Sequence, residues 1–506
     1  MVKSVHDFSL NKAKTRLVTA LKKRSNESTI ADLISATGLP KAQVEQAIKQ
    51  VADEYRGHLR VTESGEILYY FPRGMVNRSR GLRPRVERAL RSFGRSVARV
   101  AALPFKVWVM FMLVGYFVLF ITLLVLAVLA SIAASMANRG EGRRSSSAGG
   151  FLSFFFVVRV FQVFTWIWLS SGMGDYKRRP ARRQGRPLYR SVFAYVFGEE
   201  DPNKQWTDQE KTFILSFIRG RKGVLTLDEL MVMTGRSPDK AQGLLNQLLI
   251  EWEGEPAVTR EGTLVYLFPG LLKSRRTEIE QAERTPLANP RRKRLARFAD
   301  NSAKTNRWIS FFNGFNSLFS VYFLGLALLN PEPVYEFVRG EPRMRLDFAA
   351  LYHFVQRLLD SVGVEAATSV ILIVLGIVPL AFSLLFFLVP LVRRRRLKKQ
   401  NEAIKQENLR KKIYFHVLGS ADQFDPQEVH SETRDENPSD ERGFVQQVVD
   451  DLAARQSAEV EQSEGRLVYR FPELARQLSD VREFRKRVDL SRYAPGETVF
   501  DSGDRL

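Results

Sequence analysis

The sequence predicts a mainly α protein with small β-hairpins, integral to a membrane, with four transmembrane helices and three small α+β domains. Three observations predict this fold class. One octapeptide pattern occurs three times, four long stretches are apolar enough to span a bilayer, and positive charge gathers beside those stretches.

The repeated octapeptide reads GEILYYFP at 65–72, GTLVYLFP at 262–269 and GRLVYRFP at 465–472. The spacings are 197 and 203 residues, so we predict an internal repeat of a larger unit. Glycine suits a turn, alternating aliphatic and aromatic residues suit a half-buried strand, and proline ends a ladder because it has no N–H. Each copy is therefore expected to close a β-hairpin. The aromatic residues expected in the domain cores are Tyr69, Phe71, Tyr266, Phe268, Tyr469 and Phe471.

Helical periodicity precedes the hairpins. The expected helices are 11–24, 30–36 and 41–55 in copy one and 208–218, 227–233 and 238–252 in copy two. Three helices followed by a hairpin, with Thr-Gly at 37–38 and 234–235 before the third helix, resemble the winged-helix fold, a helix-turn-helix. Copy three has expected helices at 412–418 and 441–454. A polar, acidic insertion at 430–439 stands where its tight turn should be.

Four stretches are predicted to cross a membrane. Residues 107–138, 308–331 and 366–392 carry no charge and exceed the roughly 20 residues that a spanning helix needs. Residues 151–172 form the fourth predicted span, although Arg159 and Gln162 interrupt it. No apolar run of signal-peptide type lies in the first 100 residues, so we expect no cleaved export signal.

Charge predicts the orientation. Segments 73–106, 172–200, 271–307 and 393–399, which adjoin the spans, carry net charges of +9, +4, +7 and +6. Positive flanks stay cytoplasmic, so both termini and all three repeats are expected in the cytoplasm of a bacterial-type inner membrane.

The predicted order alternates domains with membrane hairpins. Winged-helix-like domains are expected at 1–72, 201–270 and 400–472, basic linkers at 73–106, 173–200 and 271–307, membrane hairpins at 107–172 and 308–392, and a tail at 473–506. The loop 332–365 of the second hairpin contains an amphipathic run that is predicted to be an interfacial helix. The tail is expected to be a helix followed by a disordered end.

Composition argues against an enzyme. The chain has no cysteine, which excludes disulfides, thiolate metal sites and cysteine nucleophiles, and its five histidines have no metal-ligand spacing. Phosphate-binding glycine loops and nucleophile elbows are missing from the sequence. We therefore expect no catalytic residue, metal or cofactor.

The third helix of a winged helix often enters the DNA major groove, so it supplies candidate recognition residues. They are Lys41, Gln43, Gln46, Lys49 and Gln50 in copy one and Lys240, Gln242 and Asn246 in copy two. Acidic residues share both helices, which weakens attraction to a phosphate backbone. Protein interaction fits these near-neutral surfaces better than nucleic acid does.

Arginine-rich runs beside the spans have two interpretations, nucleic-acid binding or a role in topology and anionic-lipid contact. We favour the second, because each basic residue gains about 1 kcal/mol from an anionic leaflet. The residues concerned are Arg178, Arg179, Arg291, Arg292, Lys293, Arg294, Arg393, Arg394, Arg395 and Arg396.

Arg159 is the sharpest intramembrane feature, because an arginine inside a span usually has a polar partner or a watery cavity. Gln162 lies one turn away, and Asn313 and Asn316 of the third span could meet it. The alternatives are a tilted segment that lets Arg159 snorkel, or a re-entrant stretch.

Three functional hypotheses follow. The first is a non-enzymatic membrane scaffold or regulatory protein that presents winged-helix-like domains to unknown cytoplasmic partner proteins. The second is a membrane-tethered DNA-binding transcription regulator. The third is a channel or transporter component centred on Arg159.

Overall fold

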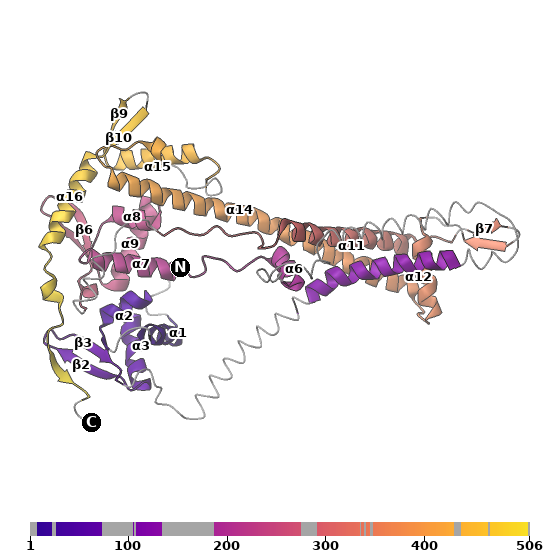
Figure 1. The fold of residues 1–506 in the computed structure, drawn as a ribbon, viewed down its shortest axis with the longest axis horizontal. Coiled ribbons are helices and arrows are strands. Elements are labelled where there is room, and N and C mark those ends of the chain that lie inside the picture. Colours follow the sequence, from indigo (N-terminus) through magenta and orange to yellow (C-terminus); the bar gives the residue numbers. More distant parts are fainter. Residues whose placement is uncertain are drawn as a thin grey trace, which may run out of the picture. The chain divides into compact units, whose positions relative to one another are not determined.

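The computed structural model describes residues 8–22, 27–72, 105, 108–133, 187–274, 291–333, 335–338, 341–344, 348–429, 437–463 and 466–503. These residues are mainly helical, with small antiparallel sheets (Figure 1). The chain forms two units. The domain unit comprises Met1–Ala89, Asp201–Ala296 and Lys399–Leu506, and the membrane unit comprises Leu90–Glu200 and Arg297–Lys398.

Helix–hairpin group 1 of the domain unit has three helices and a hairpin. Its elements are α1 (Leu10–Leu21), β1 (Glu27–Ser28), α2 (Ile30–Thr37), α3 (Lys41–Glu54), β2 (His58–Thr62) and β3 (Ile67–Tyr70). Helix α2 begins at a capping box, in which the side chains of Thr29 and Asp32 each accept the other's backbone N–H. It ends at Gly38, whose φ of 68° lies in the left-handed region.

Helix–hairpin group 2 has the same order of elements. They are α7 (Trp206–Gly220), β4 (Val224–Leu225), α8 (Leu227–Thr234), α9 (Pro238–Trp252), β5 (Glu255–Val258) and β6 (Leu264–Leu267), followed by the turn η1 (Pro269–Leu271). A second capping box joins Thr226 to Glu229, and Gly235 ends α8 with a φ of 65°. These three residues lie 197 positions after Thr29, Asp32 and Gly38, the spacing of the first two octapeptides.

Helix–hairpin group 3 begins with the last turns of α14 (Val378–Gly419). It continues through η3 (Pro426–Glu428), α15 (Glu441–Arg455), β9 (Glu459–Ser463) and β10 (Arg466–Arg470). The helix expected at 412–418 is therefore not a separate element, and no break occurs near residue 400. Residues 393–418 contain neither proline nor glycine, so nothing in this stretch stops the helix. Most of the acidic insertion, 430–436, lies outside the described residues.

The tail differs from the expectation. Its helix α16 (Pro472–Arg487) is present, but the turn η5 (Leu490–Tyr493) and strand β11 (Thr498–Asp501) replace the expected disorder. Strand β11 pairs antiparallel with β2 and completes a four-stranded sheet of order β1-β3-β2-β11. The partner that orders the tail lies more than 400 residues away in the sequence, so no local pattern could reveal it.

The three groups share cores. One buried cluster contains Leu17 and Phe71 of group 1 together with Ile214 and Phe268 of group 2. A second joins Met231 and Val232 of α8 to group 3 residues that include Ile413 and Phe471. Each octapeptide Tyr and Phe expected in a core is at most 5% exposed, which confirms that prediction.

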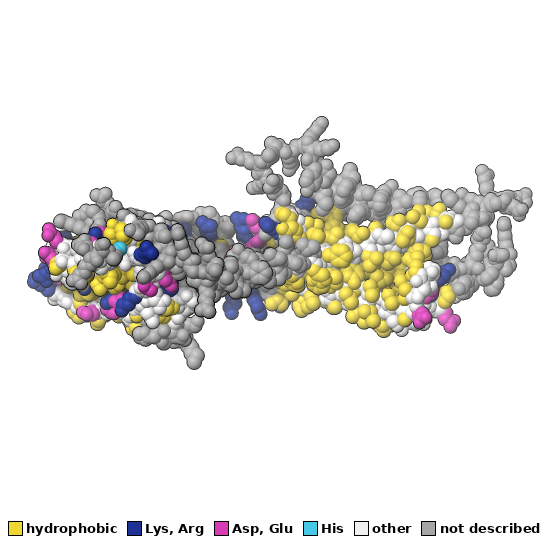
Figure 2. Space-filling view, turned by 90° about the horizontal axis from the view of Figure 1, so that it is seen from below, with side chains coloured by type: hydrophobic (Ala, Val, Ile, Leu, Met, Phe, Trp, Pro, Cys, Tyr) yellow, Lys and Arg dark blue, Asp and Glu magenta, His cyan; other side chains and the backbone are white. Residues whose placement is uncertain are grey.

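Among the described residues, three helices are long and apolar enough to cross a membrane: Trp108–Ala133, α11 (Ala303–Leu329) and Ala367–Gly419. The last is continuous through α13 (Ala367–Val370), a π-helical stretch η2 (Ile371–Ile377) and α14. Within the membrane unit much of their surface is apolar (Figure 2). Phe111, Leu318 and Leu328, for example, are each more than 60% exposed. The predicted fourth span, 151–172, lies outside the described residues.

Smaller elements complete the membrane unit. Helix α6 (Leu188–Phe197) occupies part of the segment expected to be a linker, and its Val192 and Val196 pack against Ile309 and Phe386. The loop 332–365 contains the hairpin β7 (Tyr335–Val338) and β8 (Glu341–Met344), followed by helix α12 (Ala350–Ser361). Helix α12 buries Tyr352 and Val355 in the unit's core, so its apolar face is covered by protein.

Candidate functional site

Of the candidate recognition residues on α3, some contact other residues and some are exposed to solvent. The Lys41 ammonium bonds to Glu253 of group 2 at 2.6 Å, and Gln43 is half-buried. Gln46, Lys49 and Gln50 are exposed. The structure therefore commits the first of these residues to a neighbouring group and leaves three side chains in solvent.

The corresponding positions of α9 are less suited to a phosphate backbone. Lys240 is exposed, while Gln242 donates to Asn246 within the same helix at 3.2 Å. The adjacent Asp239 pairs with Arg455 of α15 at 3.0 Å, so the start of α9 faces group 3.

The same kind of contact joins group 1 to group 2 and group 2 to group 3. Gly38, at the end of α2, lies against Lys211 and Thr212 of α7, 3.4 Å from where a Cβ would stand. Gly235, at the end of α8, lies against Glu407 and Lys411 of α14, and its carbonyl accepts a hydrogen bond from Arg410 at 3.0 Å. In both cases the second helix of one group ends on the first helix of the next.

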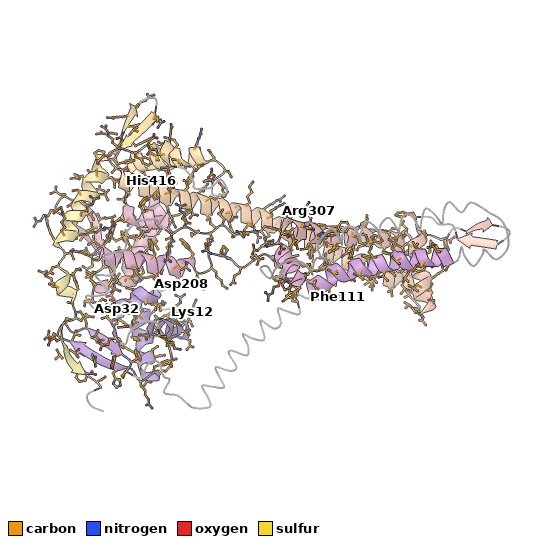
Figure 3. The ribbon with its side chains drawn as sticks, viewed as in Figure 1. Lys12, Asp32, Phe111, Asp208, Arg307 and His416 are labelled. Atoms are coloured by element: carbon orange, nitrogen blue, oxygen red, sulfur yellow. The ribbon has the colours of Figure 1, made fainter. Side chains whose placement is uncertain are left out.

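A buried ion pair lies at the first of these contacts. Asp32 lies on α2 (Figure 3). It accepts hydrogen bonds from Arg219 of α7, at 3.0 Å, and from Ser274. The side chains of Asp32 and Arg219 are 3% and 4% exposed. A carboxylate and a guanidinium removed from water in this way stabilise each other only as long as both are present.

Glu229, the counterpart of Asp32 in group 2, is also neutralised from outside its own group. Its partner is Arg485 of α16, whose guanidinium bonds to the carboxylate at 2.6 Å and to the carbonyl of Val224 at 3.0 Å. On the same helix, Val481 packs against Val224 and Val265. The tail helix is thus fastened to group 2 by both charge and apolar burial.

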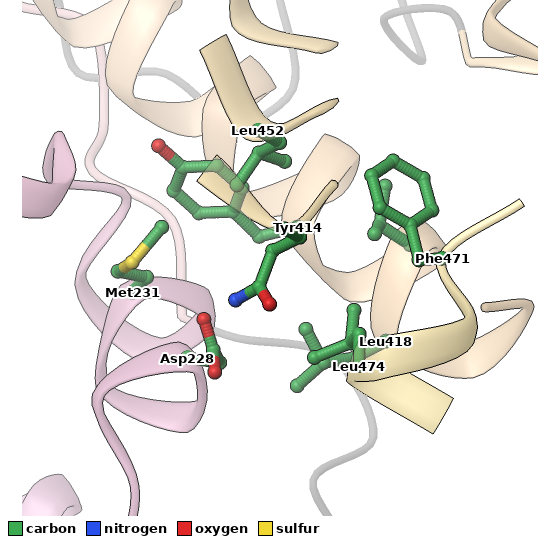
Figure 4. A pocket seen from close by; sticks show the side chains of 9 residues that line it. Asp228, Met231, Tyr414, Leu418, Leu452, Phe471 and Leu474 are labelled. Atoms are coloured by element: carbon green, nitrogen blue, oxygen red, sulfur yellow. The ribbon is translucent and has the colours of Figure 1, made fainter. Parts of the chain in front are cut away.

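Groups 2 and 3 line a small, partly open pocket of about 10 Å³ (Figure 4). Its lining includes Asp228 and Met231 of α8 and Tyr414, Leu452 and Phe471 of group 3. Burial, followed by the neighbouring Glu229 carboxylate, raises the pKa of Asp228 to about 6, although a hydrogen bond with Gln456 acts the other way. Partial removal from water therefore disfavours the charged form of the Asp228 carboxyl and favours the protonated form.

Three asparagine side chains hold the extended segment 291–296. Each donates to the carbonyl and accepts from the N–H of a single residue, over distances of 2.7–3.0 Å. The pairs are Asn203 with Arg294, Asn401 with Ala296, and Asn408 with Lys293. Because Asn401 and Asn408 lie about two turns apart on α14, they fix the segment along that helix.

This arrangement changes the interpretation of the basic run 291–294. Lys293 bonds to Glu407 at 2.5 Å and lies 5.7 Å from the ring centre of Trp206, so it is engaged within the domain unit and not free for a lipid headgroup. Arg291 and Arg294 are exposed and Arg292 is half-buried. For these three residues the lipid and topology role stays a prediction.

In the basic run 393–396, one arginine is engaged within the protein and three are exposed. Arg393 donates to the carbonyls of Ala194 and Tyr195 at 3.2 and 2.8 Å, and it lies 4.1 Å from the ring centre of Phe298. It therefore caps the carboxyl end of α6. Arg394, Arg395 and Arg396 are exposed. Arg178 and Arg179 lie outside the described residues.

The intramembrane asparagines tie α11 to two other helices. Asn313 donates to the carbonyl of Ser383 at 3.1 Å, and Asn316 donates to the carbonyl of Leu113 at 2.8 Å. Both side chains are at most 1% exposed, and neither Oδ1 atom has a hydrogen-bond partner within the described residues. Arg159 and Gln162 lie outside those residues, so their predicted meeting with the asparagines stays a prediction.

Known proteins were compared with this chain by family model, by structure and by sequence. No family model and no solved structure matches this chain. It is similar to an uncharacterized chloroplastic protein of Arabidopsis thaliana, with 27% identity over 268 residues, which are 51% of this chain and 49% of the relative. The chain thus spans about half the length of the curated relative that it matches.

Proposed function

We propose that this chain is a non-enzymatic, multi-pass membrane protein that presents three winged-helix-like domains as one interaction platform for cytoplasmic proteins. The domains are helix–hairpin groups 1, 2 and 3, which we interpret as internal repeats. The observation that carries the proposal is the repeated contact in which α2 ends on α7 and α8 ends on α14. Domains joined in this way act as a single surface and not as three independent modules.

The tail adds to this support. Helix α16 is fastened to group 2 through Arg485 and Val481, and strand β11 continues onto the sheet of group 1. A chain segment that contacts two groups in succession stabilises their association. A platform of this kind would bind partners through exposed surfaces that no single domain provides.

Four spans and cytoplasmic termini belong to the same proposal. The three apolar helices and the predicted span at 151–172 give an even number of crossings, and basic segments flank them. The exposed Arg394, Arg395 and Arg396 would then face anionic headgroups of the inner leaflet. The chloroplastic relative has a name that gives a compartment and no activity, so it adds no function.

Membrane-tethered DNA binding is the alternative. The exposed Gln46, Lys49 and Gln50 of α3 favour it, because they lie on the helix that a winged helix inserts into the major groove. The Lys41–Glu253 pair counts against it, since it withdraws a positive charge from that surface.

The test is capture of partners by the intact chain from its own membranes, compared with the Arg219→Ala variant. Arg219→Ala removes the buried ion pair between groups 1 and 2, whereas the matched control Arg16→Ala removes only the exposed pair with Asp208. We expect specific partners that the wild type and the control retain and that Arg219→Ala loses. Recovery of no partner, together with sequence-selective duplex binding at physiological salt, would favour the tethered regulator instead.

A further inference from the structure

The outer edge of β2 in group 1 is occupied by the chain's own tail. Strand β11 pairs with it in antiparallel register, Phe500 opposite Val61 and Asp501 opposite Arg60. The Glu63 N–H donates to the Glu497 carbonyl and the Ser502 N–H donates to the Leu59 carbonyl, both at 2.9 Å. Backbone bonds of this kind do not depend on the identity of the added strand.

Arg60 supplies the side-chain selectivity of this edge. Its guanidinium is held on its own group by Glu27 and by the ring of Tyr70, whose centre lies 4.5 Å away. The Nε atom donates to the Asp501 carboxylate at 2.5 Å. The Gly503 N–H and Arg60 together lower the pKa of Asp501. The edge thus offers a fixed cationic donor to a carboxylate on the incoming strand.

Strand β11 is held by these polar contacts and not by burial. Val499 is 70% exposed and Phe500 is 44% exposed. By contrast, Leu474 and Val481 of α16 are at most 3% exposed. The tail therefore has a firmly packed helix followed by a strand that contributes little apolar burial, and such a strand is exchangeable.

We propose that the β2 edge is a strand-accepting site for extended peptides that place a carboxylate opposite Arg60, and that β11 occupies it in cis. The occupant in trans is a segment of a partner protein with this pattern, which displaces β11 by adding its own strand. Because β11 is covalently attached and at high effective concentration, only a partner of good affinity opens the site. The proposal rests on the platform function only in assigning the occupant to a partner protein.

The test uses the full membrane-embedded chain and a variant that ends at Asp489 and so lacks β11. The probe is a fluorescent peptide of residues 494–503, and binding is measured by anisotropy in detergent or nanodiscs. We expect the truncated chain to bind the peptide at least about tenfold more tightly than the intact chain does. Arg60→Gln in the truncated chain, or Asp501→Asn in the peptide, should each weaken binding about tenfold, with no further loss when combined.

Folding of the truncated chain is controlled by a second variant. Phe500→Pro in the full-length chain removes a backbone N–H from β11 and leaves the chain length unchanged, and it too should gain peptide binding. Equal binding by intact and opened chains, absence of binding by both opened variants, or binding that ignores Arg60 would overturn the proposal. The assay contains no partner protein, so its failure leaves the platform function untouched.

Discussion

Asp32 combines two roles at one carboxylate. It completes the capping box that starts α2, and it accepts the buried guanidinium of Arg219 from the next group. Removal of the arginine would leave an uncompensated charge in a site that is 3% exposed. We therefore predict that Arg219→Ala destabilises the domain unit by about 3–5 kcal/mol. The measurement is urea denaturation in detergent, followed by tryptophan fluorescence, to which the buried Trp252 contributes.

The exposed pair Arg16–Asp208 is the matched control, because it joins the same two groups through side chains that are 29% and 50% exposed. Arg16→Ala should change the stability by less than about 1 kcal/mol. If both variants have equal midpoints, Asp32 and Arg219 do not form the buried pair described here.

Asp228 predicts a pH dependence. Its pKa rises from 3.8 to about 6 on folding, so the folded state holds the proton more tightly than the unfolded state does. Asp228 does not lower the free energy of unfolding below about pH 4, where its carboxyl is protonated in both states. The free energy of unfolding falls as the pH rises from there through 6. We predict that Asp228→Asn, which is neutral at every pH, stabilises the protein by about 1–3 kcal/mol at pH 7.

The gain from Asp228→Asn should shrink toward zero near pH 3.5, where the carboxyl is largely protonated in the unfolded as well as in the folded wild type. Unfolding midpoints of both proteins at the two pH values measure the difference. A gain that is the same at both pH values would mean that the Asp228 carboxyl titrates normally at this interface.

Among the elements, the ends of α2 and α8 make equivalent contacts with the next group, and these two contacts differ in tightness. A Cβ at Gly38 would stand 3.4 Å from its nearest neighbours, whereas one at Gly235 would stand 2.3 Å from the backbone carbonyl oxygen of Glu407. Gly38→Ala should cost about 1–2 kcal/mol from the left-handed backbone alone. Gly235→Ala should cost about 1–3 kcal/mol more, because α14 must shift.

Limited proteolysis and denaturation of the two glycine variants test whether Gly235→Ala destabilises the protein more than Gly38→Ala does. Cleavage between groups 2 and 3 should increase in Gly235→Ala before any cleavage appears inside a group. Equal effects of the two substitutions would show that the backbone conformation, and not the neighbouring helix, sets the cost at both sites.

The asparagines of α11 make a prediction for the membrane unit. Asn316→Leu removes the hydrogen bond to the Leu113 carbonyl and should destabilise the packing of these helices by about 1 kcal/mol. Leu318→Ala, at a position that is 68% exposed, is the control and should have a smaller effect. Unfolding in mixed micelles of increasing SDS content compares the two. A larger loss in the control would contradict the assigned packing.

At the scale of the whole molecule, local sequence patterns predict the helices and the order of elements, because interactions between residues close in the sequence determine these features. Three long apolar stretches are helices able to span a membrane, and the helix expected at 238–252 is α9 with the same bounds. The capping boxes at 29–32 and 226–229 also follow a recognisable sequence pattern. The order of helices and strands in groups 1 and 2 needs only short-range information.

Contacts between distant segments could not be predicted in this way. Nothing near Asp32 indicates that Arg219 is its partner, and nothing near Asn401 or Asn408 indicates that they hold segment 291–296. Charge alone predicts a lipid contact for Lys293, and nothing in its neighbourhood in the sequence indicates the ion pair with Glu407. The tail has the composition of a disordered end, and pairing with β2 orders it.

The most direct test concerns whether the three helix–hairpin groups form one assembly that the tail holds together. Because the chain has no cysteine, pairs of introduced cysteines can be cross-linked cleanly in native membranes with a short bis-maleimide. The pairs are Arg16→Cys with Asp208→Cys, Asp239→Cys with Arg455→Cys, and Val61→Cys with Phe500→Cys, with Lys14→Cys and Glu54→Cys as the control within group 1. We predict intramolecular cross-links for all four pairs. Cross-linking of the control alone would contradict it.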